Sequence, residues 1–123
     1  VFGEGTTVGL LATDGTLRSR LYHEALESVG LVAMSPSGPG IQYAIMDALD
    51  SVKLHGPTDD AYGALGAGVR DLDSNGATAI IAACTEVSLV FERHPPDLRW
   101  LDPLQILAEA LVREAIGSSG GQK

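Results

Sequence analysis

The stretch Ala77-Thr78-Ala79-Ile80-Ile81-Ala82-Ala83, followed directly by Cys84-Thr85-Glu86, is the most apolar segment of the chain. A short, continuous apolar run that ends in polar residues is typical of a strand covered on both faces, as in a parallel sheet. We therefore expect residues 77–83 to form the central strand of the fold, with Cys84 at its carboxyl end.

A second apolar run, residues 8–12, precedes Asp14-Gly15 and is also expected to be a strand. A helix should follow, with Thr16 or Asp14 as its N-cap and Gly30 as its end. Its apolar face would consist of Leu17, Leu21, Ala25, Leu26 and Val29. The two runs and this helix begin an alternation of strands and helices.

The rest of the chain continues that alternation. Residues 31–34 predict a short strand and residues 35–40 a loop, and helical periodicity returns from Ile41 to Val52. Thr58 is expected to cap a further helix, which Gly63, Gly66 and Gly68 should weaken. Residues 99–101 predict an edge strand, residues 104–115 a last helix, and residues 117–123 a disordered tail. The predicted fold is α/β, a small, mostly parallel sheet flanked by helices in a single domain over residues 1–116.

Composition excludes several classes of protein. The chain has 123 residues, 45% of them hydrophobic, and a formal net charge of −8, which argues against binding to nucleic acid or to anionic membranes. No apolar run approaches the ~20 residues of a membrane span, and the first residues do not resemble a signal peptide. One cysteine excludes an internal disulfide and favours the reducing cytoplasm. The chain begins with Val1, so we expect it to be an excerpt or a processed product.

Functional residues of parallel sheets lie beyond the carboxyl ends of strands, which selects residues 13–19 and 84–86. Cys84 precedes an expected helix, whose N-terminal amides favour a thiolate, so we expect it to react faster than an ordinary thiol. The alternative is a small buried core residue, and Glu86 could equally be a solvated first-turn acid. Dinucleotide, phosphate-loop and nucleophile-elbow motifs are absent, and the three histidines lack metal-ligand spacing, so neither a cofactor nor a metal is expected.

The chain resembles the second, C-terminal lobe of the aspartate/glutamate racemase superfamily over residues 7–116. The resemblance is carried by the pattern Val8-Gly9-Leu10-Leu11-Ala12-Thr13-Asp14-Gly15-Thr16, then Ser19, Tyr22, Lys53 and Cys84-Thr85-Glu86. It implies a cofactor-independent enzyme with two α/β lobes facing a cleft, each supplying a cysteine that removes or returns the Cα proton of an acidic amino acid.

Site residues follow from this resemblance. Cys84 would be one acid/base, and Thr85 and Glu86 would bind or orient the amino-acid head. Thr13 and Thr16 would offer hydroxyls to a carboxylate, and Lys53 would bind the distal acidic group. As alternatives, the two threonines could be turn and cap residues and Lys53 could complement a helix dipole. Ser19 and Tyr22 are expected to be structural.

Two departures from the family pattern affect the functional prediction. The first lobe with its own cysteine is missing, and Ala83 stands where a glycine is usual. A lobe with one cysteine cannot perform a two-base racemization alone. It would be an excerpt of a longer racemase, would pair with a second copy as a homodimer, or would have lost catalysis. A single-cysteine decarboxylase of the arylmalonate type and a small-acid binding module remain alternatives.

Overall fold

The computed structural model describes residues 5–103, and within them four strands form one parallel sheet in the order β2-β1-β3-β4. Their bounds are β1 (Thr7–Leu11), β2 (Val32–Met34), β3 (Ala79–Ala82) and β4 (Arg99–Leu101). All three pairings are parallel, with Val8 opposite both Ala33 and Ala79, and Ala79 opposite Arg99. The predicted α/β class, the parallel sheet and the internal position of the strand before Cys84 are confirmed.

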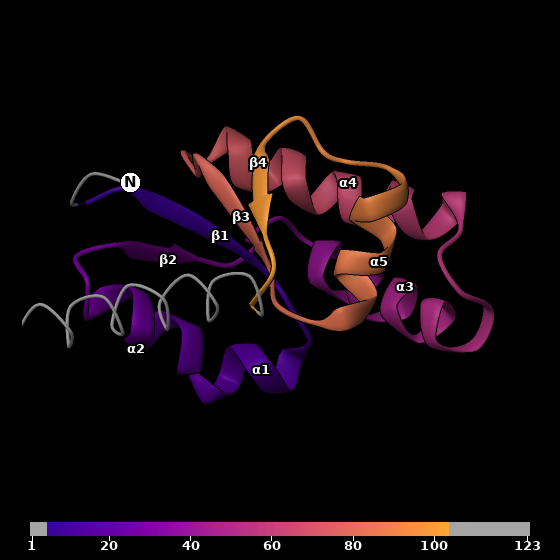
Figure 1. The fold of residues 1–123 in the computed structure, drawn as a ribbon, viewed down its shortest axis with the longest axis horizontal. Coiled ribbons are helices and arrows are strands. Elements are labelled where there is room, and N and C mark those ends of the chain that lie inside the picture. Colours follow the sequence, from indigo (N-terminus) through magenta and orange to yellow (C-terminus); the bar gives the residue numbers. More distant parts are fainter. Residues whose placement is uncertain (1–4, 104–123) are drawn as a thin grey trace, which may run out of the picture.

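Helices cover both faces of the sheet (Figure 1). On one side lie α1 (Asp14–Ser19) and α2 (Leu21–Glu27), and on the other α3 (Ile41–His55), α4 (Asp59–Ser74) and α5 (Thr85–Arg93). Because strand side chains alternate between faces, Leu10 and Ile81 join the first side while Leu11 and Ile80 join the second. The layers therefore follow from the continuous apolar character of the two inner strands.

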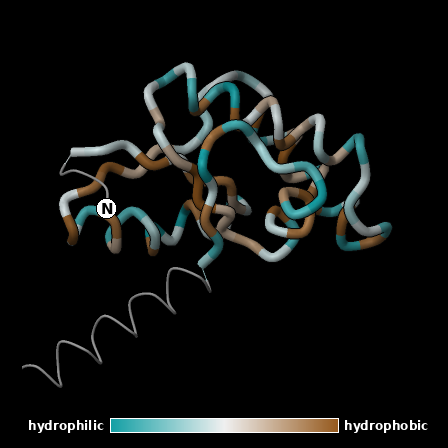
Figure 2. The backbone as a smooth tube through the Cα atoms, turned by 45° about the horizontal axis from the view of Figure 1, so that its top comes forward, coloured by the Kyte–Doolittle hydropathy of each residue, from teal (hydrophilic) through white to brown (hydrophobic). Residues whose placement is uncertain are grey.

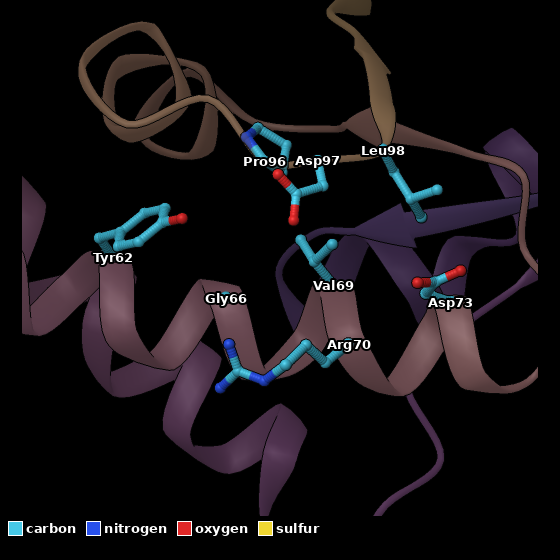
Figure 3. A pocket seen from close by; sticks show the side chains of 8 residues that line it. All are labelled: Tyr62, Gly66, Val69, Arg70, Asp73, Pro96, Asp97 and Leu98. Atoms are coloured by element: carbon cyan, nitrogen blue, oxygen red, sulfur yellow. The ribbon is translucent and has the colours of Figure 1, made fainter.

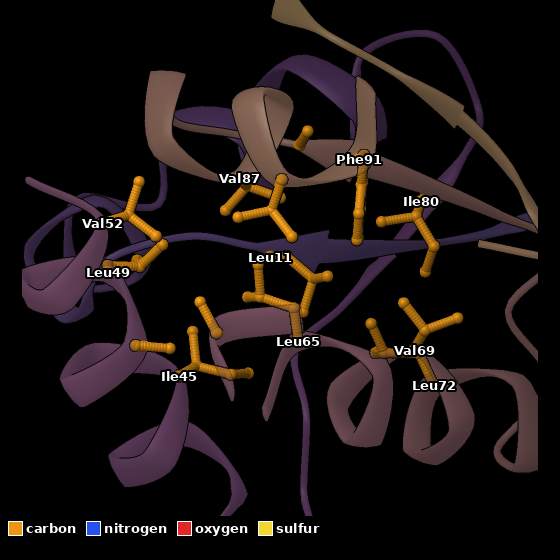
Figure 4. Close-up of a cluster of buried hydrophobic side chains, with 14 of the residues drawn as sticks. Leu11, Ile45, Leu49, Val52, Leu65, Val69, Leu72, Ile80, Val87 and Phe91 are labelled. Atoms are coloured by element: carbon orange, nitrogen blue, oxygen red, sulfur yellow. The ribbon is translucent and has the colours of Figure 1, made fainter. Parts of the chain in front are cut away.

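The larger core lies between the sheet and helices α3, α4 and α5 (Figure 4). Each helix contributes one apolar stripe, and fully buried members include Leu49 of α3, Leu65 of α4 and Phe91 of α5. In Figure 2 hydrophobic brown gathers along the strands, whereas the helices alternate between brown and teal. This alternation is the amphipathic pattern by which the helices were predicted.

The third and fourth helices match their sequence patterns closely. Thr58 caps α4 as expected, with its hydroxyl oxygen accepting from the Ala61 N–H at 3.2 Å. Gly68 has a packing role that the propensity argument missed. A Cβ there would lie 2.9 Å from Ile45 Cδ1 and 3.0 Å from Leu11 Cδ2. The missing side chain therefore lets α4 approach both α3 and β1.

The single helix predicted after the first strand is wrong, because the segment forms α1 and α2 with a break at Arg20. Arg20 adopts a left-handed backbone conformation, with φ 58°. The N-cap is Thr13 rather than Thr16 or Asp14. After the break only part of the predicted apolar face is inward: Leu26 packs against the core, whereas Leu21 and Val29 are 64% and 68% exposed.

Three predictions lie outside the described residues: the helix over 104–115, the tail over 117–123 and the domain boundary at 116. Among residues 5–103, no helix has the length and apolar character that crossing a membrane would require.

Candidate functional site

The carboxyl ends of β1 and β3 lie side by side and bring together the two predicted loops. Leu11 is opposite Ala82 in the sheet register, and the Ala83 N–H donates to the Leu11 carbonyl at 2.9 Å. Two residues beyond the Leu11–Ala82 pair come Thr13 and Cys84. The topology therefore places the threonine loop and the cysteine at the same edge of the sheet.

The β1–α1 loop holds its two threonines against each other. The Thr13 hydroxyl donates to Thr16 Oγ1 at 3.0 Å, and the Thr16 N–H donates to Thr13 Oγ1 at 3.2 Å. Thr13 thus caps α1, which was the structural alternative for this residue. Both residues are half-buried, so capping leaves part of each side chain open to solvent.

The sequence pattern did not identify two side chains at this edge, and both belong to α3. Gln42 Nε2 donates to the Ala12 carbonyl at 2.9 Å and to Asp14 Oδ1 at 3.0 Å. The Asp14 N–H lies 3.3 Å from Met46 Sδ. Nothing local in the sequence indicates these contacts, because they join residues about thirty positions apart. Gln42 and Met46 lie beside the predicted apolar stripe of this helix without interrupting it, so the pattern gives no signal for either.

Cys84 is half-buried and precedes the first residue of α5, as predicted. The surroundings of Cys84 act against the activated thiol that was expected. Burial is the largest influence and raises the pKa of Cys84, and the Glu86 carboxylate raises it further. The N–H groups of Val87 and Glu86 and the charge of Lys53 act in the opposite direction but do not prevail. The net effect favours the protonated thiol over the thiolate.

Lys53 and Glu86, predicted separately, come together at the β3 end of the site. Lys53 Nζ lies 3.9 Å from Glu86 Oε1, with the lysine side chain 55% exposed and the glutamate side chain 20% exposed. A pair this open to water contributes little to stability. It does show that α3 reaches α5, while Thr85 lies exposed beside Glu86.

Ser19 and Tyr22, both expected to be structural, differ in their surroundings. The Ser19 hydroxyl donates to the Thr16 carbonyl at 2.7 Å and accepts from the Leu21 N–H at 3.2 Å, so it bridges the break between α1 and α2. Burial, and next the charge on Cys84, raise the pKa of Tyr22. Tyr22 thus lies within the electrostatic range of the cysteine.

A depression on the surface lies away from this edge of the sheet (Figure 3). Side chains of α4 and of residues 96–98 line it, among them Tyr62, Arg70 and Leu98. None of the predicted site residues lies there. In the described part of the chain, no three His, Cys, Asp or Glu residues are grouped so as to hold a metal ion.

Fold and site together define a class of protein: an α/β lobe with an open parallel sheet, whose candidate site lies at the carboxyl ends of its inner strands. The sequence model of the Asp/Glu/hydantoin racemase family matches residues 2–111. The chain belongs to that family, and the resemblance inferred from its motifs is confirmed.

Solved structures of similar fold extend the comparison to the architecture. A crystal structure of a candidate Asp/Glu racemase from Yersinia pestis matches with a TM-score of 0.73 at 23% identity, covering 89% of this chain and 48% of that one. The Picrophilus torridus aspartate racemase matches with a TM-score of 0.70 at 24% identity, covering 89% and 45%. At these identities the likeness concerns the fold.

A sequence relative extends the comparison. An uncharacterized protein encoded in the pnlA 3′ region of Pectobacterium carotovorum subsp. carotovorum is 32% identical over 88 residues, which are 72% of this chain and 57% of that protein. The chain thus spans about half the length of the relatives it matches.

Proposed function

We propose that this chain is one lobe of a cofactor-independent amino-acid racemase of the aspartate/glutamate type, in which Cys84 exchanges a proton with the substrate Cα. The observation that carries the proposal is the position of Cys84. In a chain of the Asp/Glu/hydantoin racemase family, it stands at the end of β3, level with the Thr13 loop at the end of β1.

The chemistry demands stabilisation of a developing carbanion, because the Cα–H of an amino acid is a weak acid. Fixed donors aimed at the substrate carboxylate supply that stabilisation without reorganisation during the reaction. In this proposal the Thr16 hydroxyl and the exposed Thr85 supply such donors, and Thr13 joins them by turning its hydroxyl hydrogen from Thr16 Oγ1 to the carboxylate. Glu86 orients the ammonium group, and Lys53 binds the distal acidic group of the substrate.

The surroundings of Cys84 suit it to one step of the proposed reaction. Burial and the Glu86 carboxylate raise the pKa of Cys84, so the resting thiol is protonated and suited to donate a proton to Cα. Racemization also requires a base on the opposite face of the substrate. We assign that base to a facing lobe, which is either another part of a longer chain or a second copy of this one, and we place the protein in the cytoplasm.

A decarboxylase of the arylmalonate type is the second candidate, and the same protonated thiol favours it. Loss of carbon dioxide from a malonate leaves a carbanion equivalent that needs only one proton donor. Such an enzyme therefore works with a single cysteine. The two candidates share Cys84 as a proton donor and differ in whether a second acid/base is used.

One assay separates these candidates from a binding module. The full-length protein is incubated with each enantiomer of aspartate and of glutamate, and separately with an arylmalonate. Chiral chromatography and carbon dioxide release are the readouts. We expect interconversion of the enantiomers of one acidic amino acid without added cofactor. Carbon dioxide release without racemization would support the decarboxylase instead, and tight binding with neither reaction would support a binding module.

A further inference from the structure

Gln42 joins α3 to the loop that carries the candidate carboxylate-binding hydroxyls. Both hydrogens of its side-chain amide are used, one toward the Ala12 carbonyl at 2.9 Å and one toward Asp14 Oδ1 at 3.0 Å. These two acceptors stand on either side of Thr13. The glutamine therefore fixes the backbone before Thr13 and the side chain after it.

The same face of α3 reaches the other half of the site. Gln42, Met46 and Lys53 are separated by four and seven residues, a spacing that places them along one stripe of a helix. Met46 Sδ lies 3.3 Å from the Asp14 N–H, and Lys53 Nζ lies 3.9 Å from Glu86 Oε1. One rigid helix thus contacts both the β1–α1 loop and the start of α5.

The remaining polar atom of Gln42 argues against a merely stabilising role. Gln42 Oε1 is buried, and no group in the described part of the chain hydrogen-bonds to it. A buried acceptor without a partner is unfavourable, so an apolar residue here would avoid that cost. An apolar residue at position 42 would lose the two hydrogen bonds that orient the loop.

We propose that Gln42 is a positioning residue of the candidate site. It holds Thr13 and Thr16 in the orientation that receives a substrate carboxylate, and α3 sets the separation of that loop from the cysteine end of the site. The substrate part of this inference rests on the proposed function. The structural part, that Gln42 fixes the loop, stands on the hydrogen bonds alone.

The first test measures the loop directly in the full-length protein. Gln42→Leu removes both donors, and Gln42→Glu places a carboxylate against two acceptors. Tyr43→Gln is the matched control, because Tyr43 is the next residue of α3 and is 83% exposed. We expect hydrogen exchange at the Asp14 and Thr16 amides to become about tenfold faster in both Gln42 variants. Amides in the middle of α4 should exchange as in the wild type.

The second test uses racemization kinetics with the same variants. We expect the KM of the Gln42 variants for the amino acid to rise about tenfold, while the alkylation rate of their Cys84 stays unchanged. The Tyr43→Gln control should keep the thermal midpoint of the wild type. Unchanged amide exchange in the Gln42 variants would overturn the loop-fixing role. Faster exchange with an unchanged KM would overturn the substrate role. If the wild type turns over no substrate, the proposed function fails, and the exchange data still decide whether Gln42 holds the loop.

Discussion

Cys84 illustrates how opposing local influences decide the chemistry of one residue. The sequence predicted its place before a helix correctly, and helix N-termini do favour thiolates. Burial acts against an activated thiol more strongly than those amides favour one, and burial depends on how α5 and the loops pack. Glu86, two residues further along the motif, adds a negative charge that further raises the pKa of Cys84.

The charges of Glu86 and Lys53 should move the Cys84 pKa in opposite directions. Glu86→Gln removes a charge that disfavours the thiolate, so the pKa of Cys84 falls. Lys53→Gln removes a charge that favours the thiolate, so the pKa rises. The rate of iodoacetamide labelling as a function of pH gives both midpoints. At pH 7 the Glu86 variant should label faster than the wild type, and the Lys53 variant more slowly.

Glu92→Gln is the control for the labelling experiment, because it removes an exposed carboxylate from the same helix. Its profile should match that of the wild type. A Glu86→Gln midpoint at or above the wild-type value would contradict the electrostatic account of Cys84.

Residues of the candidate site were predictable where a motif carries them. Thr13, Thr16, Cys84 and Glu86 all lie at the carboxyl edge of the sheet, where the strand pattern placed them. Gln42 was not predictable, because its bonds to Ala12 and Asp14 depend on how α3 crosses the end of β1. A contact between distant residues leaves no periodic trace in a single sequence.

At the scale of elements, helix α4 contains glycines of two kinds. Gly63 is exposed, and a Cβ there would meet nothing within 4 Å, whereas a Cβ at Gly68 would meet Ile45 Cδ1 at 2.9 Å. Helix propensity alone therefore treats alike two positions that packing separates.

Alanine at these two glycines should affect stability in opposite directions. Gly63→Ala should raise the free energy of unfolding by about 0.5–1 kcal/mol, because alanine loses less backbone entropy in a helix. Gly68→Ala should lower it by about 1 kcal/mol, because overpacking against Ile45 and Leu11 exceeds the gain in propensity. Urea denaturation of both variants measures the difference. A Gly68→Ala protein more stable than the wild type would show that α4 moves away without cost.

The break between α1 and α2 shows the limit of periodicity at this scale. In the sequence, Leu17, Leu21 and Ala25 recur every four residues, as on one face of a helix, so a single helix was predicted. The left-handed Arg20 redirects the chain, and Leu21 becomes exposed. Left-handed helix ends usually carry glycine or asparagine, and arginine gives no such indication. By contrast, Thr58 marked the start of α4 correctly.

At the scale of the whole molecule, the sheet and its helices reproduce about half of two larger solved chains. The continuous apolar character of residues 8–12 and 77–83, together with the helical patterns between them, predicted the parallel sheet, because such short runs are typical of strands covered on both faces.

The central claim, that Cys84 exchanges a proton with Cα, is tested most directly by deuterium incorporation. The full-length protein and its Cys84→Ser variant are incubated with the acidic amino acid in deuterium oxide, and mass spectrometry measures deuterium at Cα. We expect incorporation with the wild type and a loss of roughly 100-fold or more in the variant, with an unchanged circular dichroism spectrum. Incorporation by the variant at the wild-type rate would remove Cys84 from the mechanism.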